Sequence, residues 1–193
     1  MITNAADLPM HRQTLIAQQV SSLNHQPNSS LLSKSTEEIM AVIASGIMLV
    51  KTTQDQPLFI IAFEPTGNPL FTEVGMTCNL APEQIRGKHI FPNIIETYRK
   101  INGNGKQILY LTTTDIRMMR VAEKSGFQAT TNIHTVFPPD VLEFCCAPCS
   151  QEKTGAPEHG QQKICCPRFK GEFLPQNGDS CTQQPCRIFT QVM

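Results

Sequence analysis

The sequence predicts an α+β fold with one main core, because two kinds of hydrophobic pattern follow each other along the chain. Apolar residues alternate with polar ones, or run without interruption, in short segments typical of strands: 47–52, 58–63, 70–80 and 108–111. Other segments have apolar residues at helical spacing: 35–46, 89–101 and 115–124. A chain of 193 residues can bury one sizeable core and carry one small appended module.

The first part of the chain divides at Ser35. Residues 1–34 are rich in glutamine, asparagine and serine and hold one modest helical stretch at 15–23, so we expect a loosely attached polar leader. Ser35-Thr36-Glu37-Glu38 can form a capping box, which predicts a helix that ends near Gly46. The strands 47–52 and 58–63 then form a hairpin across the polar turn 53–56.

The strand at 70–80 has two different faces. Glu73 is its one acidic residue and faces away from the apolar side, which fits either a functional site or a solvated surface. Cys78 lies on the apolar side, so a small buried core residue is preferred there to a reactive thiol. The apolar face consists of Thr72, Val74, Met76, Cys78 and Leu80.

A basic glycine turn follows this strand and leads into the helix 89–101, where Pro92 is tolerated in or near the first turn. The apolar run 108–111 is typical of a strand covered on both faces. Thr114 or Asp115 can cap the next helix, and Gly126 supplies its left-handed stop. This order places unpaired backbone amides at a helix N-terminus beside a strand end, an arrangement that holds phosphate.

Two motifs in this region resemble the acyl-CoA-binding halves of GNAT N-acetyltransferases. They are Arg-Gly-Lys-x-Ile after a strand, at 86–90, and Glu-Lys-x-Gly-Phe after a helix, at 123–127. The resemblance covers roughly residues 35–136 and implies a GNAT-like domain at 35–139. It further implies a mixed, mostly antiparallel central sheet flanked by helices, with acetyl-CoA as co-substrate. The residues that would hold CoA are Arg86, Gly87, Lys88, His89, Ile90 and Phe91.

The chain departs from the family pattern at three positions. His89 and Phe91 replace glycines of the phosphate turn, and the His89 imidazole could either donate to phosphate or block the pocket. A site lost by drift, or an ordinary turn from strand to helix, also agrees with these residues. Ala122 stands where the family often has a tyrosine that protonates the leaving thiolate, so an acid must come from elsewhere, for example Tyr110 or water.

Acetyl transfer to an amine requires a general base near the thioester, because the attacking nitrogen must be neutral. In the family this base is often a carboxylate on the strand before the turn, or a water that it holds. Glu73 and Tyr110 are therefore the candidate catalytic residues, with a simple exposed glutamate as the alternative for Glu73.

Seven of the eight cysteines lie between Cys145 and Cys186, so we expect the chain to divide near 137–139 and to end in a cysteine-rich tail at 140–193. In a reducing cytosol such crowding favours metal ligation over disulfides. A metal could supply the folding energy that this glycine- and glutamine-rich segment lacks. The candidate zinc ligands are Cys146, Cys149, Cys165, Cys181 and Cys186.

Other interpretations of the tail stay open. They are an iron–sulfur cluster or soft-metal sensor, disulfides, and free or redox-active thiols. Cys145 and Cys166 are weaker ligands because adjacent cysteines rarely bind one tetrahedral ion together. His159 is a surface-loop residue or an extra ligand.

Charge and hydropathy limit the choice of partners. Sixteen basic and sixteen acidic side chains give no net charge, which argues against nucleic acid and anionic membranes as partners. The segment 39–50 is too short to span a bilayer and no signal peptide is evident, so a cytoplasmic protein is expected.

The leading hypothesis is an N-acyltransferase that acts on a small-molecule or protein amine. A second is a catalytically altered GNAT-like binding module with a metal-binding tail, and a third is a thiol-based redox or metal-trafficking protein.

Overall fold

The computed structural model describes residues 1–24, 34–54, 56–85, 89–103, 107–113, 115–130, 136–141 and 187–193. These residues form two compact units. Unit 1 comprises residues 1–64 and 74–106 with Met193, and unit 2 comprises residues 65–73 and 107–192.

Unit 1 is built on four neighbouring strands in the order β1 (Ile2–Asn4), β2 (Met48–Thr53), β3 (Gln56–Pro65) and β4 (Phe71–Asn79). The first two pairs are antiparallel, and β2 and β3 form the hairpin that the sequence predicts. Met1 lies just before the edge strand β1, and its amino group donates a 2.9 Å hydrogen bond to the Thr52 carbonyl of β2.

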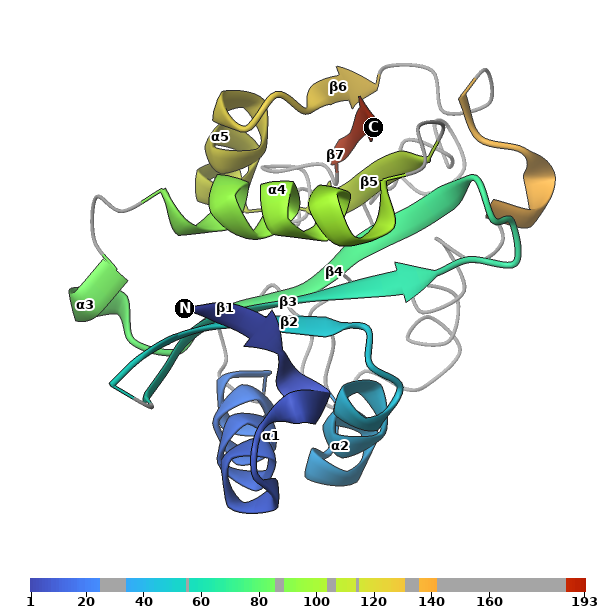
Figure 1. Cartoon of the computed structure of the whole chain (residues 1–193). Helices are drawn as coiled ribbons and strands as arrows, with labels where there is room; N and C mark the ends of the chain where they lie inside the picture. The colour runs from blue at the N-terminus through green and yellow to red at the C-terminus, as the bar shows by residue number, and fades with distance from the viewer. Residues whose placement is uncertain are drawn as a thin grey trace, which may run out of the picture. The chain divides into compact units, whose positions relative to one another are not determined.

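Helices cover both faces of the unit 1 strands. Figure 1 shows α1 (Met10–Asn24) and α2 (Thr36–Ala44) on one side of β1, β2 and β3, and α4 (Ile90–Asn102) on the other. Two short helices, η1 (Ala5–Asp7) and α3 (Pro82–Ile85), complete the unit. The helix α2 starts with the predicted capping box, in which Ser35 and Glu38 each accept a hydrogen bond from the other's backbone amide.

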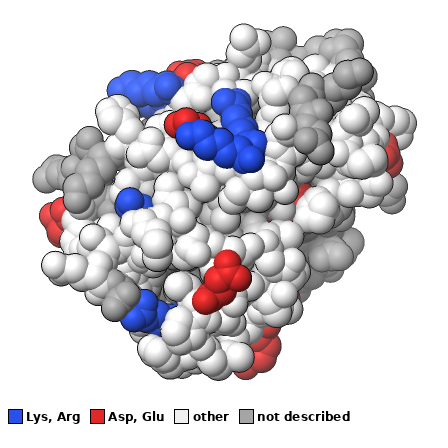
Figure 2. Space-filling model, viewed as in Figure 1, with Lys and Arg blue, Asp and Glu red and all other residues white. Residues whose placement is uncertain are grey.

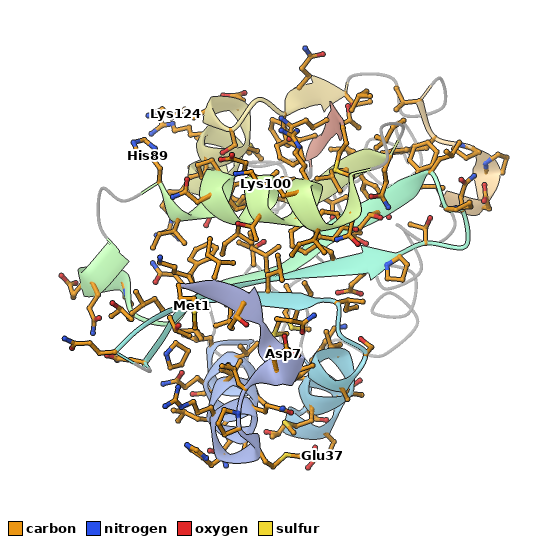
Figure 3. All side chains as sticks on the ribbon, viewed as in Figure 1. Met1, Asp7, Glu37, His89, Lys100 and Lys124 are labelled. Atoms are coloured by element: carbon orange, nitrogen blue, oxygen red, sulfur yellow. The ribbon has the colours of Figure 1, made fainter. Side chains whose placement is uncertain are left out.

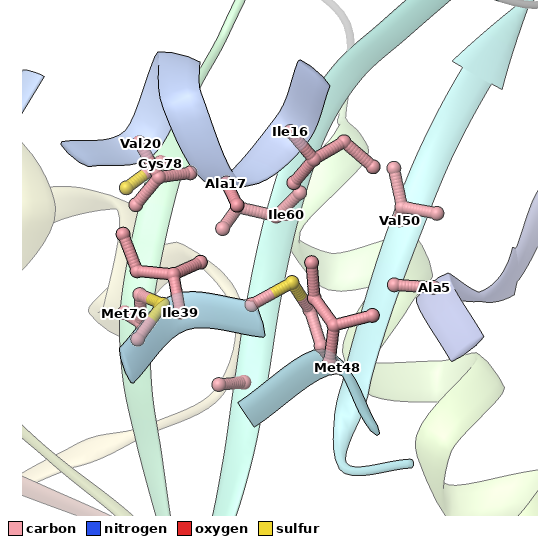
Figure 4. Close-up of a cluster of buried hydrophobic side chains, with 12 residues drawn as sticks. Ala5, Ile16, Ala17, Val20, Ile39, Met48, Val50, Ile60, Met76 and Cys78 are labelled. Atoms are coloured by element: carbon pink, nitrogen blue, oxygen red, sulfur yellow. The ribbon is translucent and has the colours of Figure 1, made fainter. Parts of the chain in front are cut away.

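The α1–α2 cluster is the apolar core between these two helices and the sheet (Figure 4). The helix α1 contributes Ile16, Ala17 and Val20, none of which is exposed. The cluster consists of Ala5, Ile16, Ala17, Val20, Ile39, Ile43, Met48, Val50, Ile60, Ala62, Met76 and Cys78.

The expectation of a loosely attached leader at 1–34 is wrong for residues 1–24. These residues form a sheet strand and a helix that buries Ile16, Ala17 and Val20 completely in the α1–α2 cluster. The signal in the sequence is weak, because only three positions of α1 are buried and glutamine and serine occupy much of the rest. A narrow apolar stripe is sufficient when a second helix covers it, and α2 packs beside α1.

Unit 2 continues the strand arrangement from the first residues of β4 in the order β4, β5 (Ile108–Thr113), β7 (Arg187–Val192) and β6 (Gln128–Thr130). The strand β5 runs parallel to β4 and antiparallel to β7. Together with the antiparallel pairs of unit 1, this gives the mixed, mostly antiparallel sheet that the resemblance implies.

The expected domain boundary at 139/140 is wrong for the last strand of the chain. The predicted cysteine-rich tail includes residues 187–192, but these residues form β7 and pair with β5 on one side and with β6 on the other. The described residues that flank the cysteine-rich stretch are buried, since Val141 is fully buried and Ile188 is 1% exposed. Val141 and Ile188, on either side of that stretch, are therefore part of the core of unit 2.

The helix α5 (Ile116–Lys124) has the predicted start and stop. Asp115 caps it by accepting a 2.8 Å hydrogen bond from the Arg117 amide. Gly126 ends it with a φ of +86°, and a Cβ there would lie 2.7 Å from the Gln191 side chain. The same Gln191 donates a 3.0 Å hydrogen bond to the Ser125 carbonyl, which ties the end of α5 to β7.

Charged side chains of both signs lie on the surface of the described residues. On the face shown in Figure 2, basic side chains are interspersed with acidic ones and neither sign forms a continuous patch. Among the residues that the structure describes, no helix is both long and apolar enough to cross a membrane.

We predict that Ile16→Ala lowers the free energy of unfolding by about 2–5 kcal/mol, because it removes a fully buried side chain from the α1–α2 cluster. Its neighbour Leu15 is 43% exposed, so Leu15→Ala should change stability by no more than about 0.5 kcal/mol. Urea denaturation of both variants measures the difference. Equal urea midpoints for the two variants would contradict the packing of α1 into the core of unit 1.

Candidate functional site

The two candidate catalytic residues lie side by side in unit 2. In the parallel register of β4 and β5, Glu73 is the partner of Tyr110. The Tyr110 hydroxyl lies 3.5 Å from Oε2 of Glu73, and the Thr112 hydroxyl lies 3.4 Å from Oε1. The carboxylate therefore accepts from one hydroxyl at each oxygen. Both distances are long for hydrogen bonds, so the contacts leave room for adjustment when a ligand binds.

Strand geometry explains why these residues meet. Residues two apart on a strand point to the same face, so Tyr110 and Thr112 both reach the side on which Glu73 lies. Thr112 was missed in the sequence analysis, although its spacing from Tyr110 could have identified it. The arrangement is a carboxylate between two hydroxyl donors, which can accept a proton and keep its orientation.

Burial differs between the two candidates. Tyr110 is fully buried, whereas Glu73 is half-buried and keeps part of its surface exposed. The Tyr110 ring belongs to a group that we call the tyrosine cluster, with Phe71, Phe137, Val141 and Ile188. A ligand could reach the Glu73 carboxylate from outside, while the Tyr110 ring is enclosed by protein.

The predicted CoA-binding turn is described in part. Arg86, Gly87 and Lys88 lie outside the described residues. His89 precedes the first residue of α4, is exposed, and makes no side-chain capping hydrogen bond (Figure 3).

Ile90 and Phe91 begin α4 and are 4% and 3% exposed. Their buried side chains cannot serve as phosphate ligands, so only their backbone amides are candidates. The first turn contains no acidic residue and the last turn contains Arg99 and Lys100. No carboxylate of the helix itself competes with an anion at its positive end.

Ala122 is fully buried in α5, and its carbonyl accepts the amides of Ser125 and Phe127. This position carries no hydroxyl that could protonate a leaving thiolate. The Glu-Lys-x-Gly-Phe motif thus retains its helix-ending role without the family's tyrosine.

The predicted metal ligands Cys146, Cys149, Cys165, Cys181 and Cys186 lie outside the described residues, as do Cys145, Cys166 and His159. Within the part of the chain that is described, no group of three or more His, Cys, Asp or Glu side chains is placed to hold a metal ion.

Cys78 is a buried core residue, as the sequence predicts. It is 2% exposed in the α1–α2 cluster and forms no disulfide. Burial raises the pKa of its thiol to about 12, so the thiol stays protonated at neutral pH. A nucleophilic role for Cys78 does not fit this environment.

Solved structures of acetyltransferases share the fold of this chain. N-acetylglutamate synthase from Neisseria gonorrhoeae, solved with coenzyme A and N-acetyl-glutamate, is 15% identical with a TM-score of 0.58. The match covers 100% of this chain and 34% of that enzyme, so the chain spans about a third of its length.

Two other structures match over nearly their whole length. Rv2747 from Mycobacterium tuberculosis, solved with CoA, is 11% identical with a TM-score of 0.61, and the match covers 100% of this chain and 99% of that one. The polyamine N-acetyltransferase of Drosophila melanogaster, which forms N-acetylagmatine, is 10% identical with a TM-score of 0.54 and the same two coverages.

No protein-family model and no curated protein matches the sequence. At the identities of these structures the likeness concerns the fold alone, and it confirms the predicted GNAT-like α+β fold.

We predict that Cys78 resists alkylation in the native protein. Iodoacetamide at pH 8 should leave it unmodified, because the thiol is buried and its raised pKa keeps it protonated. The same reagent in denaturant should label it fully, as peptide mass spectrometry would show. Rapid native labelling of Cys78 would contradict the burial described above.

Proposed function

We propose that this protein is an N-acyltransferase that moves an acetyl group from acetyl-CoA to a primary amine. The observation that carries the proposal is the Glu73 carboxylate beside the Tyr110 and Thr112 hydroxyls, on the strand that precedes the candidate CoA turn. The GNAT-like fold supports the same reaction, because the matched structures include N-acetyltransferases.

The proposed reaction is a direct transfer within a ternary complex. The amine nitrogen attacks the thioester carbonyl, a C–N bond forms and the C–S bond breaks. Glu73 removes the proton from the nitrogen, directly or through one water molecule, and the CoA sulfur leaves as a thiolate that takes a proton from solvent. The products are an amide and CoA, and no oxidant or metal is consumed.

Within this scheme Tyr110 holds the base and does not protonate the thiolate. Its hydroxyl points at Glu73 and its ring is fully buried, so its effect on the substrate passes through the carboxylate. Thr112 acts on the other carboxylate oxygen. Two donors, one at each oxygen, orient the carboxylate once these contacts shorten on ligand binding, which favours one direction of proton transfer.

We place the CoA pyrophosphate at the N-terminus of α4, held by backbone amides from the turn that contains Arg86, Gly87 and Lys88. His89 supports this location because its ring is exposed and makes no capping bond, so the imidazole can turn toward a phosphate or away from it. The buried Ile90 and Phe91 anchor the start of the helix.

For the acceptor we propose a primary amine on a small molecule or a protein N-terminus. Acceptor or product names from the matched structures provide the first probes: glutamate, agmatine, and a peptide with an N-terminal serine.

Calorimetric titration with acetyl-CoA tests the cofactor site. The native protein should bind acetyl-CoA, and His89→Gly should bind at least as tightly because it restores a glycine of the phosphate turn. Binding by the variant alone would indicate a blocked turn and would favour the altered binding module. Absence of binding by both proteins would refute the proposed function.

We predict that Glu73→Gln lowers kcat about 10²-fold or more, because glutamine cannot accept the amine proton. The matched control is Glu96→Gln on α4, whose carboxylate is 60% exposed and pairs with Lys100, and which should retain full activity. Mass spectrometry of the acetylated amine is the suitable assay, since thiol reagents would also react with the protein's own cysteines. Full activity of Glu73→Gln would remove Glu73 as the base.

We further propose that the cysteine-rich stretch binds a structural zinc ion through thiolates drawn from Cys146, Cys149, Cys165, Cys181 and Cys186 in the reducing cytoplasm. The C-x2-C spacing of the first pair supports this. Elemental analysis of reduced protein should give about one zinc per chain, and the Cys146→Ser, Cys149→Ser double variant should lose it. A metal-free, reduced and folded preparation would contradict the proposal.

A further inference from the structure

We propose that Phe137 is a positioning residue for the Glu73–Tyr110 pair. This inference rests on the proposed function and extends it to a residue that the sequence analysis assigned only to a domain boundary. Phe137 is 3% exposed and lies in the tyrosine cluster of unit 2.

Phe137 contacts both of the paired strands, β4 and β5, on which Glu73 and Tyr110 lie. Its ring centroid is 5.0 Å from that of Tyr110 at an interplanar angle of 60°, and 5.6 Å from that of Phe71 at 73°. Phe71 starts the β4 segment that pairs with β5, and Glu73 ends it. One aromatic side chain therefore contacts both strands of the pair, and both contacts have the tilted or edge-on geometry that aromatic rings prefer.

The position of the Tyr110 ring determines where its hydroxyl lies. At 3.5 Å the contact with Glu73 is at the limit of a hydrogen bond, so a small change in the χ1 angle of Tyr110, which swings the whole ring and its hydroxyl, would lose it. Val141 and Ile188 are buried aliphatic members of the cluster, whereas Phe137 places an aromatic ring against the Tyr110 ring, where it limits the swing of that ring. Among the described residues, Phe137 is thus a neighbour that can limit the movement of the Tyr110 ring.

A positioning role differs from a general packing role in what it changes. Phe137→Leu keeps the site apolar but removes the edge of the ring, so the Tyr110 hydroxyl should lose its place on the Glu73 carboxylate. The expected result is a kcat about tenfold to hundredfold lower, with the KM for acetyl-CoA unchanged. The matched control is Phe189→Leu, since Phe189 is fully buried on β7 in the same unit but does not belong to the tyrosine cluster.

A double-mutant cycle gives the decisive readout. In a Tyr110→Phe background there is no hydroxyl to position, so Phe137→Leu should cause little further loss of kcat, whereas Phe189→Leu should have the same effect in both backgrounds. Full additivity of Phe137→Leu and Tyr110→Phe would overturn the proposal. Thermal unfolding of each variant separates loss of folded protein from loss of rate.

A spectroscopic measurement keeps the proposal testable even if the protein proves inactive on every amine. The chain has no tryptophan and two tyrosines, Tyr98 and Tyr110, so in Tyr98→Phe the near-ultraviolet circular dichroism of tyrosine reports Tyr110 alone. Phe137→Leu should weaken this band and Phe189→Leu should preserve it. An unchanged tyrosine band in Phe137→Leu would refute the positioning role. A weakened band in a protein that acetylates no amine would refute only the proposed function.

Discussion

The parallel pairing of β4 with β5 is the constraint on which the candidate site depends. It places Glu73 opposite Tyr110 and brings Thr112 to the same carboxylate. Parallel neighbours cannot be joined by a tight turn, so the chain between them must make a long crossover, and here that crossover includes α3 and α4. The crossover that contains α4 is thus a topological requirement of the pair that holds the carboxylate.

Residues far along the chain complete unit 2. The strand β7 lies between β5 and β6, and Ile188 on β7 packs in the same cluster as Val141, which precedes the cysteine-rich stretch. Gln191 reaches the end of α5 and donates to the Ser125 carbonyl beside Gly126. The cysteine-rich stretch is therefore flanked on both sides by residues of the cluster that contains Tyr110.

The sequence correctly predicted features that depend on a few neighbouring residues. The capping box at Ser35, the cap at Asp115, the left-handed Gly126 and the buried Cys78 each follow from a few neighbouring residues. The resemblance of two short motifs also gave the correct fold, which the matched structures confirm. Expectations failed where order depends on a distant partner: the strands β1 and β7 were not predicted, and the predicted helix at 15–23 was expected to attach loosely but packs in the core as part of α1.

The sequence by itself determined the type of most central elements, the α+β fold and the acidic residue on the strand before the basic turn. The tertiary structure alone decided that Tyr110 and Thr112 face Glu73, that Phe137 packs against the Tyr110 ring, and that the segments 2–4 and 187–192 pair in the sheet. The physical reason is that capping and periodicity are set by residues a few positions apart. Register and packing are set by partners tens of residues away, and no local pattern encodes them.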